Sequence, residues 1–203
     1  MSIACLYRGK IEHAVVYDPI RREEFIASRG RGAQLNGHRI RVGDRQELQE
    51  TLIGTGVPFL GHCDAHLDWY SQSLVAVTSR CMGIRRGGSA ALDLAYVAAG
   101  RLDGFWEMGL NQWDIAAGAL LVREAGGLMT DLSGGEGWYE SGNVVCGNSK
   151  LMRQLLPSSN GLNSSVEPGG RGTRQESKPT AGGRLSVSRE SGLPDQRLRA
   201  RAP

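Results

Sequence analysis

The alanine-rich segment between Ser89 and Gly100 places the strongest constraint on how this chain can fold. Ser is favoured at helix N-caps and Gly just beyond helix ends, so we predict a helix over residues 89–99. One face of this helix carries small side chains, and small side chains let a helix approach its neighbours closely. We therefore expect this helix to pack closely against a sheet. The alanines are Ala90, Ala91, Ala95, Ala98 and Ala99.

Strand and helix patterns alternate along the chain around this segment. Residues 2–7 and 11–17 alternate enough to form two strands of a hairpin, and Asn36-Gly37 is a strong hairpin-turn signal. Interleaved strands and helices of this length are typical of the α/β class. We predict further strands at 24–28, 51–56, 80–85, 102–107, 128–132 and 143–146, and helices at 66–78, 114–125 and 149–156.

Composition divides the chain into two parts. Residues 1–157 are enough for one domain with a hydrophobic core. Residues 158–203 contain no Phe, Trp or Tyr and are dominated by Gly, Ser, Pro and Arg, with eight basic and four acidic side chains. Such a segment cannot bury enough apolar surface to offset its ordering entropy, so we expect a disordered basic tail of net charge +4.

Several classes of protein are disfavoured by the sequence. No apolar run approaches the ~20 residues that cross a bilayer, and the first residues lack a signal-peptide pattern, so we expect a cytoplasmic protein without membrane contact. The four cysteines show no C-x-x-C spacing, which disfavours zinc and a disulfide framework. We expect reduced thiols at Cys5, Cys63, Cys81 and Cys146.

Asp114 stands where an irregular segment turns into a helix of small residues. It can be an N-cap, because Asp accepts the unpaired N–H groups of a first helical turn. It can also be a metal ligand, with the positive helix end close to an anionic substrate. Local sequence alone favours the cap, since caps are far more common.

The segment from Trp113 to Gly118 resembles the second signature of the inositol monophosphatase family, the Mg²⁺-dependent, lithium-sensitive sugar phosphatases. The likeness extends in one collinear run over residues 2–156. It includes the segments 10–19, 30–37, 88–95 and 100–107.

The resemblance implies a layered αβαβα fold like that of fructose-1,6-bisphosphatase. The family's first signature, Asp-Pro-(Ile/Leu)-Asp-Gly-Thr, and a Glu-Glu pair precede the part that corresponds to Ser2-Ile3-Ala4. We therefore expect a chain without the family's N-terminal helices and first strands. Family members end close to the position of Leu156, so the resemblance implies that 158–203 is a run-on or out-of-frame tail.

The resemblance also implies roles for individual residues. Asp114 would ligate Mg²⁺ and contact a substrate hydroxyl, Glu107 would hydrogen-bond inositol hydroxyls, and Gly88, Ser89 and Ala90 would line the substrate pocket. The local alternatives are a cap at Asp114, a solvated strand end at Glu107 and capping at Gly88-Ser89. With the resemblance, the functional roles are preferred for Asp114 and Glu107.

The expected function is Mg²⁺-dependent hydrolysis of an inositol phosphate, and the resemblance implies a homodimer, as in many relatives. We expect the isolated chain to be inactive, because the carboxylates and amides of the first signature have no visible substitutes. One alternative is a non-catalytic protein that acts with the transcription machinery, as some bacterial relatives do, with nucleic acid bound by the basic tail. Another is a sibling phosphatase for a nucleotide, fructose 1,6-bisphosphate or histidinol phosphate.

Overall fold

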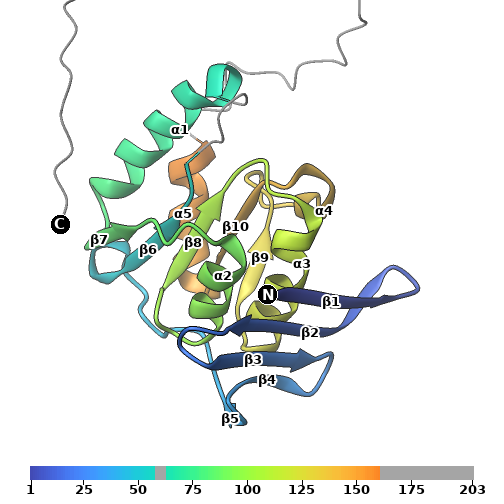
Figure 1. Cartoon of the computed structure of the whole chain (residues 1–203). Helices are drawn as coiled ribbons and strands as arrows, with labels where there is room; N and C mark the ends of the chain where they lie inside the picture. Colours follow the sequence, from blue (N-terminus) through green and yellow to red (C-terminus); the bar gives the residue numbers. More distant parts are fainter. Residues whose placement is uncertain (58–62, 161–203) are drawn as a thin grey trace, which may run out of the picture. The chain divides into compact units, whose positions relative to one another are not determined.

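The computed structural model of the chain describes residues 1–57 and 63–160 (Figure 1). Its first sheet is a five-stranded antiparallel meander in which each strand pairs with the next. The turn between the last two strands holds Asn36 and Gly37 at φ 49° and 81°, which confirms the predicted tight turn. The strands are β1 (Ser2–Tyr7), β2 (Lys10–Asp18), β3 (Glu23–Ser28), β4 (Gly32–Leu35) and β5 (His38–Arg39).

The second sheet is mixed, with the strand order β7-β6-β8-β10-β9. Strand β6 pairs in parallel with both β7 and β8, whereas β10 pairs antiparallel with β8 and β9. The carboxyl ends of β7, β6 and β8 therefore meet at one edge of the sheet. The strands are β6 (Leu52–Thr55), β7 (Gly83–Arg85), β8 (Gly104–Glu107), β9 (Leu128–Thr130) and β10 (Val144–Gly147).

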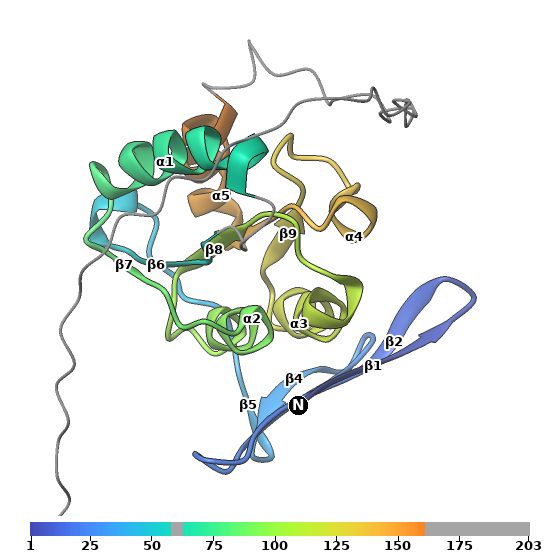
Figure 2. The same ribbon diagram turned by 45° about the horizontal axis from the view of Figure 1, so that its top comes forward.

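Helices separate and cover the sheets (Figure 2). Helices α2 (Ala90–Ala98) and α3 (Gln112–Glu124) lie between the two sheets. Helices α1 (Cys63–Thr78) and α5 (Ser149–Asn160) lie on the other face of the second sheet. The layers run sheet, helices, sheet, helices, which confirms the predicted α/β class and the layer order that the resemblance implies.

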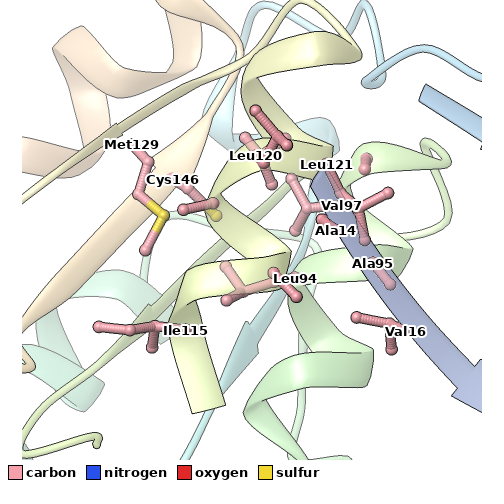
Figure 3. Close-up of a cluster of buried hydrophobic side chains, with 14 of the residues drawn as sticks. Ala14, Val16, Leu94, Ala95, Val97, Ile115, Leu120, Leu121, Met129 and Cys146 are labelled. Atoms are coloured by element: carbon pink, nitrogen blue, oxygen red, sulfur yellow. The ribbon is translucent and has the colours of Figure 1, made fainter. Parts of the chain in front are cut away.

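The core between the sheets is apolar and tightly packed (Figure 3). Leu94 of α2 and Ile115 of α3 are fully buried there. A Cβ atom on Gly118 would come within 2.5 Å of the Leu94 side chain, so α2 and α3 approach each other closely at this point. The core also includes Ala14 and Val16 of β2, Ala95 and Val97 of α2, Leu120 and Leu121 of α3, Met129 of β9 and Cys146 of β10.

Some predicted boundaries need correction. Helix α3 begins at Gln112 rather than Asp114, and α1 begins at Cys63 rather than His66. Helix α5 continues to Asn160, four residues beyond the predicted end at Leu156. The rest of the predicted tail, 161–203, lies outside the described residues. Two short helices were not predicted, because a single turn has no apolar periodicity: they are η1 (Leu48–Glu50) and α4 (Trp138–Ser141).

Two expectations from the sequence, on membrane-spanning segments and on the state of the cysteines, can be compared with the described residues. No helix within 1–57 and 63–160 has both the length and the hydropathy that a membrane-spanning helix requires. Cys5, Cys81 and Cys146, the cysteines whose side chains are described, are free thiols.

Candidate functional site

A cavity of about 180 Å³ lies where the parallel strands β6, β7 and β8 end. Clefts at the carboxyl ends of parallel strands are the usual binding sites of open α/β sheets. All five residues that the resemblance implicated line this cavity. Its lining is Gly56, Val57, Arg86, Gly88, Ser89, Ala90, Glu107, Leu110 and Asp114.

Glu107 is the last residue of β8, and its carboxyl group is largely buried beside Gly56. A Cβ atom on Gly56 would collide with the Glu107 carboxylate, so a side chain at position 56 would displace it. Burial raises the pKa of Glu107 to about 7, and the charges of Asp93 and Asp114 add to the increase. Glu107 is therefore not the solvated strand end of the local alternative.

Asp93 is a second buried carboxylate near the cavity, 4% exposed, to which the sequence prediction gave no role. Burial raises its pKa to about 6, opposed by the charge of Arg86. A Cβ atom on Gly87 would lie 2.5 Å from its Oδ1 atom, so the loop before α2 passes directly over this group. The sequence signal that could have identified Asp93 is its spacing. It lies three residues after Ala90 and four before Val97, so the three side chains share one helix face.

Asp114 occupies the third position of α3, not its N-cap, which is Asn111. The Asn111 backbone N–H donates to Asp114 Oδ2 at 3.2 Å, as in a capping box. The local alternative of an N-cap at Asp114 is therefore wrong, although the Asp114 carboxylate does accept from the backbone N–H of the N-cap residue. Asp114 still faces the cavity and acts electrostatically on Glu107.

The N-terminus of α2 forms another wall of the cavity. Gly88 has a φ of 86°, a left-handed conformation that favours glycine. Ser89 is the N-cap residue as predicted, but its side chain makes no capping hydrogen bond. Arg86 is exposed and lines the cavity, whereas Arg85 donates to the Ile84 carbonyl oxygen instead. This wall thus offers a helix N-terminus, a hydroxyl and a guanidinium to an anionic group.

A divalent cation fits the chemistry of Asp114 but not the number of nearby ligands. Carboxylate oxygen is a preferred ligand of Mg²⁺. Among the side chains described within 1–57 and 63–160, however, no group of three or more His, Cys, Asp or Glu is placed to hold a metal ion. A metal bound at Asp114 would need further ligands from outside the described residues.

Known proteins resemble this chain over about four fifths of its length. A Pseudomonas aeruginosa protein named Nus factor SuhB is 56% identical over 156 residues, which are 77% of this chain and 58% of that protein. The crystal structure of extragenic suppressor protein suhB from Bartonella henselae is 45% identical, with a TM-score of 0.76, and the match covers 81% of this chain and 61% of that one. For the IMPase of Thermotoga maritima the identity is 37% and the TM-score 0.71, and the match covers 79% and 60% of the two chains.

The chain thus spans about three fifths of the length of these relatives. The family model described as the inositol monophosphatase family matches residues 1–163. With this match, the fold and the relatives in agreement, the chain belongs to the inositol monophosphatase family.

Proposed function

We propose that this chain carries the substrate-facing part of a phosphatase site for an inositol phosphate. One observation carries the proposal: Glu107 and Asp114, from β8 and α3, face a single cavity against the N-terminus of α2. The cavity combines groups for an anion with carboxylates for hydroxyl groups. A phosphorylated polyol presents both kinds of group.

Different residues of the site would bind the phosphate group and the hydroxyl groups of the substrate. Arg86 and the N-terminal turn of α2 attract the phosphate, because a guanidinium and a helix N-terminus both favour anions. With a pKa of about 7, Glu107 holds a proton in a large fraction of molecules at neutral pH. It can therefore either donate a hydrogen bond to a sugar hydroxyl or accept one from it.

Asp114 would supply one oxygen ligand to Mg²⁺. When bound in such a site, Mg²⁺ neutralises phosphate oxygens and lowers the pKa of a bound water. Phosphoryl transfer depends almost entirely on this kind of positioning and charge stabilisation. Because no group of three or more candidate ligands is placed to hold a metal ion among the described residues, we propose that the 203-residue chain alone does not turn over substrate.

We expect no Mg²⁺-dependent phosphate release when the purified chain is given myo-inositol 1-phosphate, 3′-phosphoadenosine 5′-phosphate or fructose 1,6-bisphosphate. The assay measures inorganic phosphate, with Asp114→Asn as the matched variant. Release that disappears in Asp114→Asn would show that the ligand set is complete and would contradict this expectation. Substrate binding is tested separately: myo-inositol 1-phosphate should shift the amide NMR signals of Ser89 and Ala90, and unshifted signals would contradict the proposed subsite.

A second candidate function is a non-catalytic role with the transcription machinery. It is favoured by the name Nus factor SuhB, which relatives from P. aeruginosa and Escherichia coli carry at 56% and 49% identity. We propose that any nucleic-acid affinity of this chain resides in the basic residues of 161–203. A homodimer, expected from the resemblance, also stays a prediction.

Deleting residues 161–203 should abolish binding of single-stranded RNA, and binding by the full chain should fall steeply between 50 and 200 mM salt. Fluorescence anisotropy of a labelled oligonucleotide measures both effects. Affinity that survives the deletion would place the nucleic-acid surface on residues 1–160 instead.

A further inference from the structure

A second cavity, of about 320 Å³, lies apart from the candidate site and shares no lining residue with it. It is bounded by the turn of the β1–β2 hairpin, Arg29 beyond β3, Arg123 in the last turn of α3, and the segment 136–140 around α4. Its volume reaches the lower end of the range for small-molecule sites, roughly 300 to 1,000 Å³. Nothing proposed for the phosphatase site uses this cavity.

Three cationic side chains from separate elements converge on it, and two of them are held in place. Arg29 pairs through Nε with Glu12 at 3.2 Å and donates from Nη2 to the Ile11 carbonyl oxygen at 2.6 Å. Arg123 donates from Nη2 to Glu136 at 2.6 Å, and its Cζ atom lies 5.3 Å from the centre of the Trp138 ring. In each guanidinium the Nη1 group has no partner within the described part of the chain, so it can donate to a ligand.

Lys10 is the third cation, and among the described residues its ammonium group makes no hydrogen bond or ion pair. The Oε2 atom of Glu136 accepts from Arg123 and, at 3.4 Å, from Trp138 Nε1, and the Arg123 hydrogen bond holds the pKa of Glu136 below its usual value. Glu140 is the other carboxylate in the lining. Arg29 is paired with Glu12 and Arg123 with Glu136, so among the described residues Lys10 and Glu140 carry the unpaired charges of the lining. The Lys10 ammonium and the Nη1 groups of the two arginines are the donors that an anionic group can use.

Apolar groups form the rest of the lining. Leu6 and Ile11 come from the hairpin, and Trp138 packs edge-to-face on Tyr139 with ring centres 5.6 Å apart. These groups offer a surface to a flat or ring-shaped body. Cavities that bind small molecules combine such a surface with a few placed polar groups.

We propose that this cavity binds a small organic anion, in which a carboxylate or phosphate group is attached to a ring. The anionic group lies between Lys10 and Arg29, and the ring lies against Ile11 and Tyr139. Glu140 accepts a hydrogen bond from a hydroxyl or amino substituent of the ring.

The test is an NMR titration of the full chain with benzoate, phenyl phosphate, inorganic phosphate and cyclohexanol. Benzoate or phenyl phosphate should shift the amide signals of Gly9, Ile11 and Tyr139, and whichever binds more tightly identifies the anionic group. Inorganic phosphate and cyclohexanol should each bind at least tenfold more weakly than the better ring anion, because each lacks half of the recognised chemistry. Equal binding of all four probes, or no shift at Gly9 and Tyr139 with either ring anion, would overturn the proposal.

Lys10→Gln and Arg29→Gln should each weaken the binding about tenfold, the size expected for one charged hydrogen bond. Lys10→Gln is the cleaner variant, since among the described residues the Lys10 ammonium group makes no hydrogen bond or ion pair that its replacement could disturb. Arg31→Gln is the matched control, because Arg31 is exposed and does not line the cavity. Undiminished affinity in Lys10→Gln and Arg29→Gln, or an equal loss in Arg31→Gln, would show that general surface charge and not this cavity holds the anion.

Discussion

Replacing Glu107 by Gln is expected to raise the free energy of unfolding by about 3 kcal/mol at pH 8, and by less than about 1 kcal/mol at pH 5. The reason is that burial beside Gly56, with Asp93 and Asp114 nearby, raises the pKa of Glu107 from 4.5 to about 7. The folded chain therefore opposes ionisation of this carboxyl group. Gln has nearly the same shape and carries no charge to bury.

The pH window follows from the direction of this pKa change. Below pH 4.5 the carboxyl group is protonated in both the folded and the unfolded chain, so it does not lower the free energy of unfolding. Between pH 4.5 and about 7 the unfolded chain loses the proton while the folded chain keeps it, so stability falls as the pH rises. Above pH 7 the whole penalty is present, and Glu107→Gln removes it.

Urea denaturation at pH 5 and pH 8, with EDTA present, measures the effect. Glu24→Gln, an exposed position on β3, is the matched control and should change stability by less than about 0.5 kcal/mol at either pH. A gain in Glu107→Gln of equal size at both pH values would show that the carboxyl group is not ionised against its environment. Asp93→Asn should behave similarly with a window ending near pH 6, and the double variant should gain less than the sum, since the two charges repel each other.

Replacing Gly118 by Val is expected to destabilise the chain by about 3 kcal/mol or more. A Cβ atom at this position would lie 2.5 Å from both Cβ and Cδ1 of Leu94, and Val adds two further methyl groups. Helices α2 and α3 would have to separate in the middle of the core. Leu94 is fully buried, so it has no open space into which to move.

Thermal and urea denaturation of Gly118→Val should therefore show a lower midpoint or no cooperative transition. Gly83→Ala is the control: its Cβ atom would meet only Leu52 Cδ1, at 3.5 Å, and we expect a change within about 1 kcal/mol. Wild-type stability in Gly118→Val would mean that the two helices are not closely apposed.

The parts of this fold that the sequence predicted are those with strong local signals. The Asn36-Gly37 turn and the alanine-rich helix ending at Gly100 depend on the conformations that individual residues favour, and both occur as expected. The beginning of α3 was displaced because Asn111 and Asp114 are both good N-cap residues, and only the surrounding structure decides between them.

The residues of the candidate site also divide into those with a local sequence signal and those whose place depends on the surrounding structure. Glu107, Asp114 and the segment 88–90 could be proposed because their sequence resembles a known motif. Asp93 could not be given a role in this way, since its position beside the cavity depends on the rotation of α2 about its own axis and on the path of Gly87. Arg86 follows β7 directly, and its place in the lining depends on where β7 lies relative to β6 and β8.

The parallel pairing of β6 with both β7 and β8 sets a lower limit on the length of any shortened version of this protein. Gly56, Arg86, Glu107 and Asp114 each follow or belong to a different element, so no excised peptide shorter than 56–114 can hold the whole cavity lining. The helices that complete the lining also bury their inner faces against β1–β4 on one side and the second sheet on the other. A minimal domain for engineering therefore has to retain both sheets, and residues can be removed only from segments outside them.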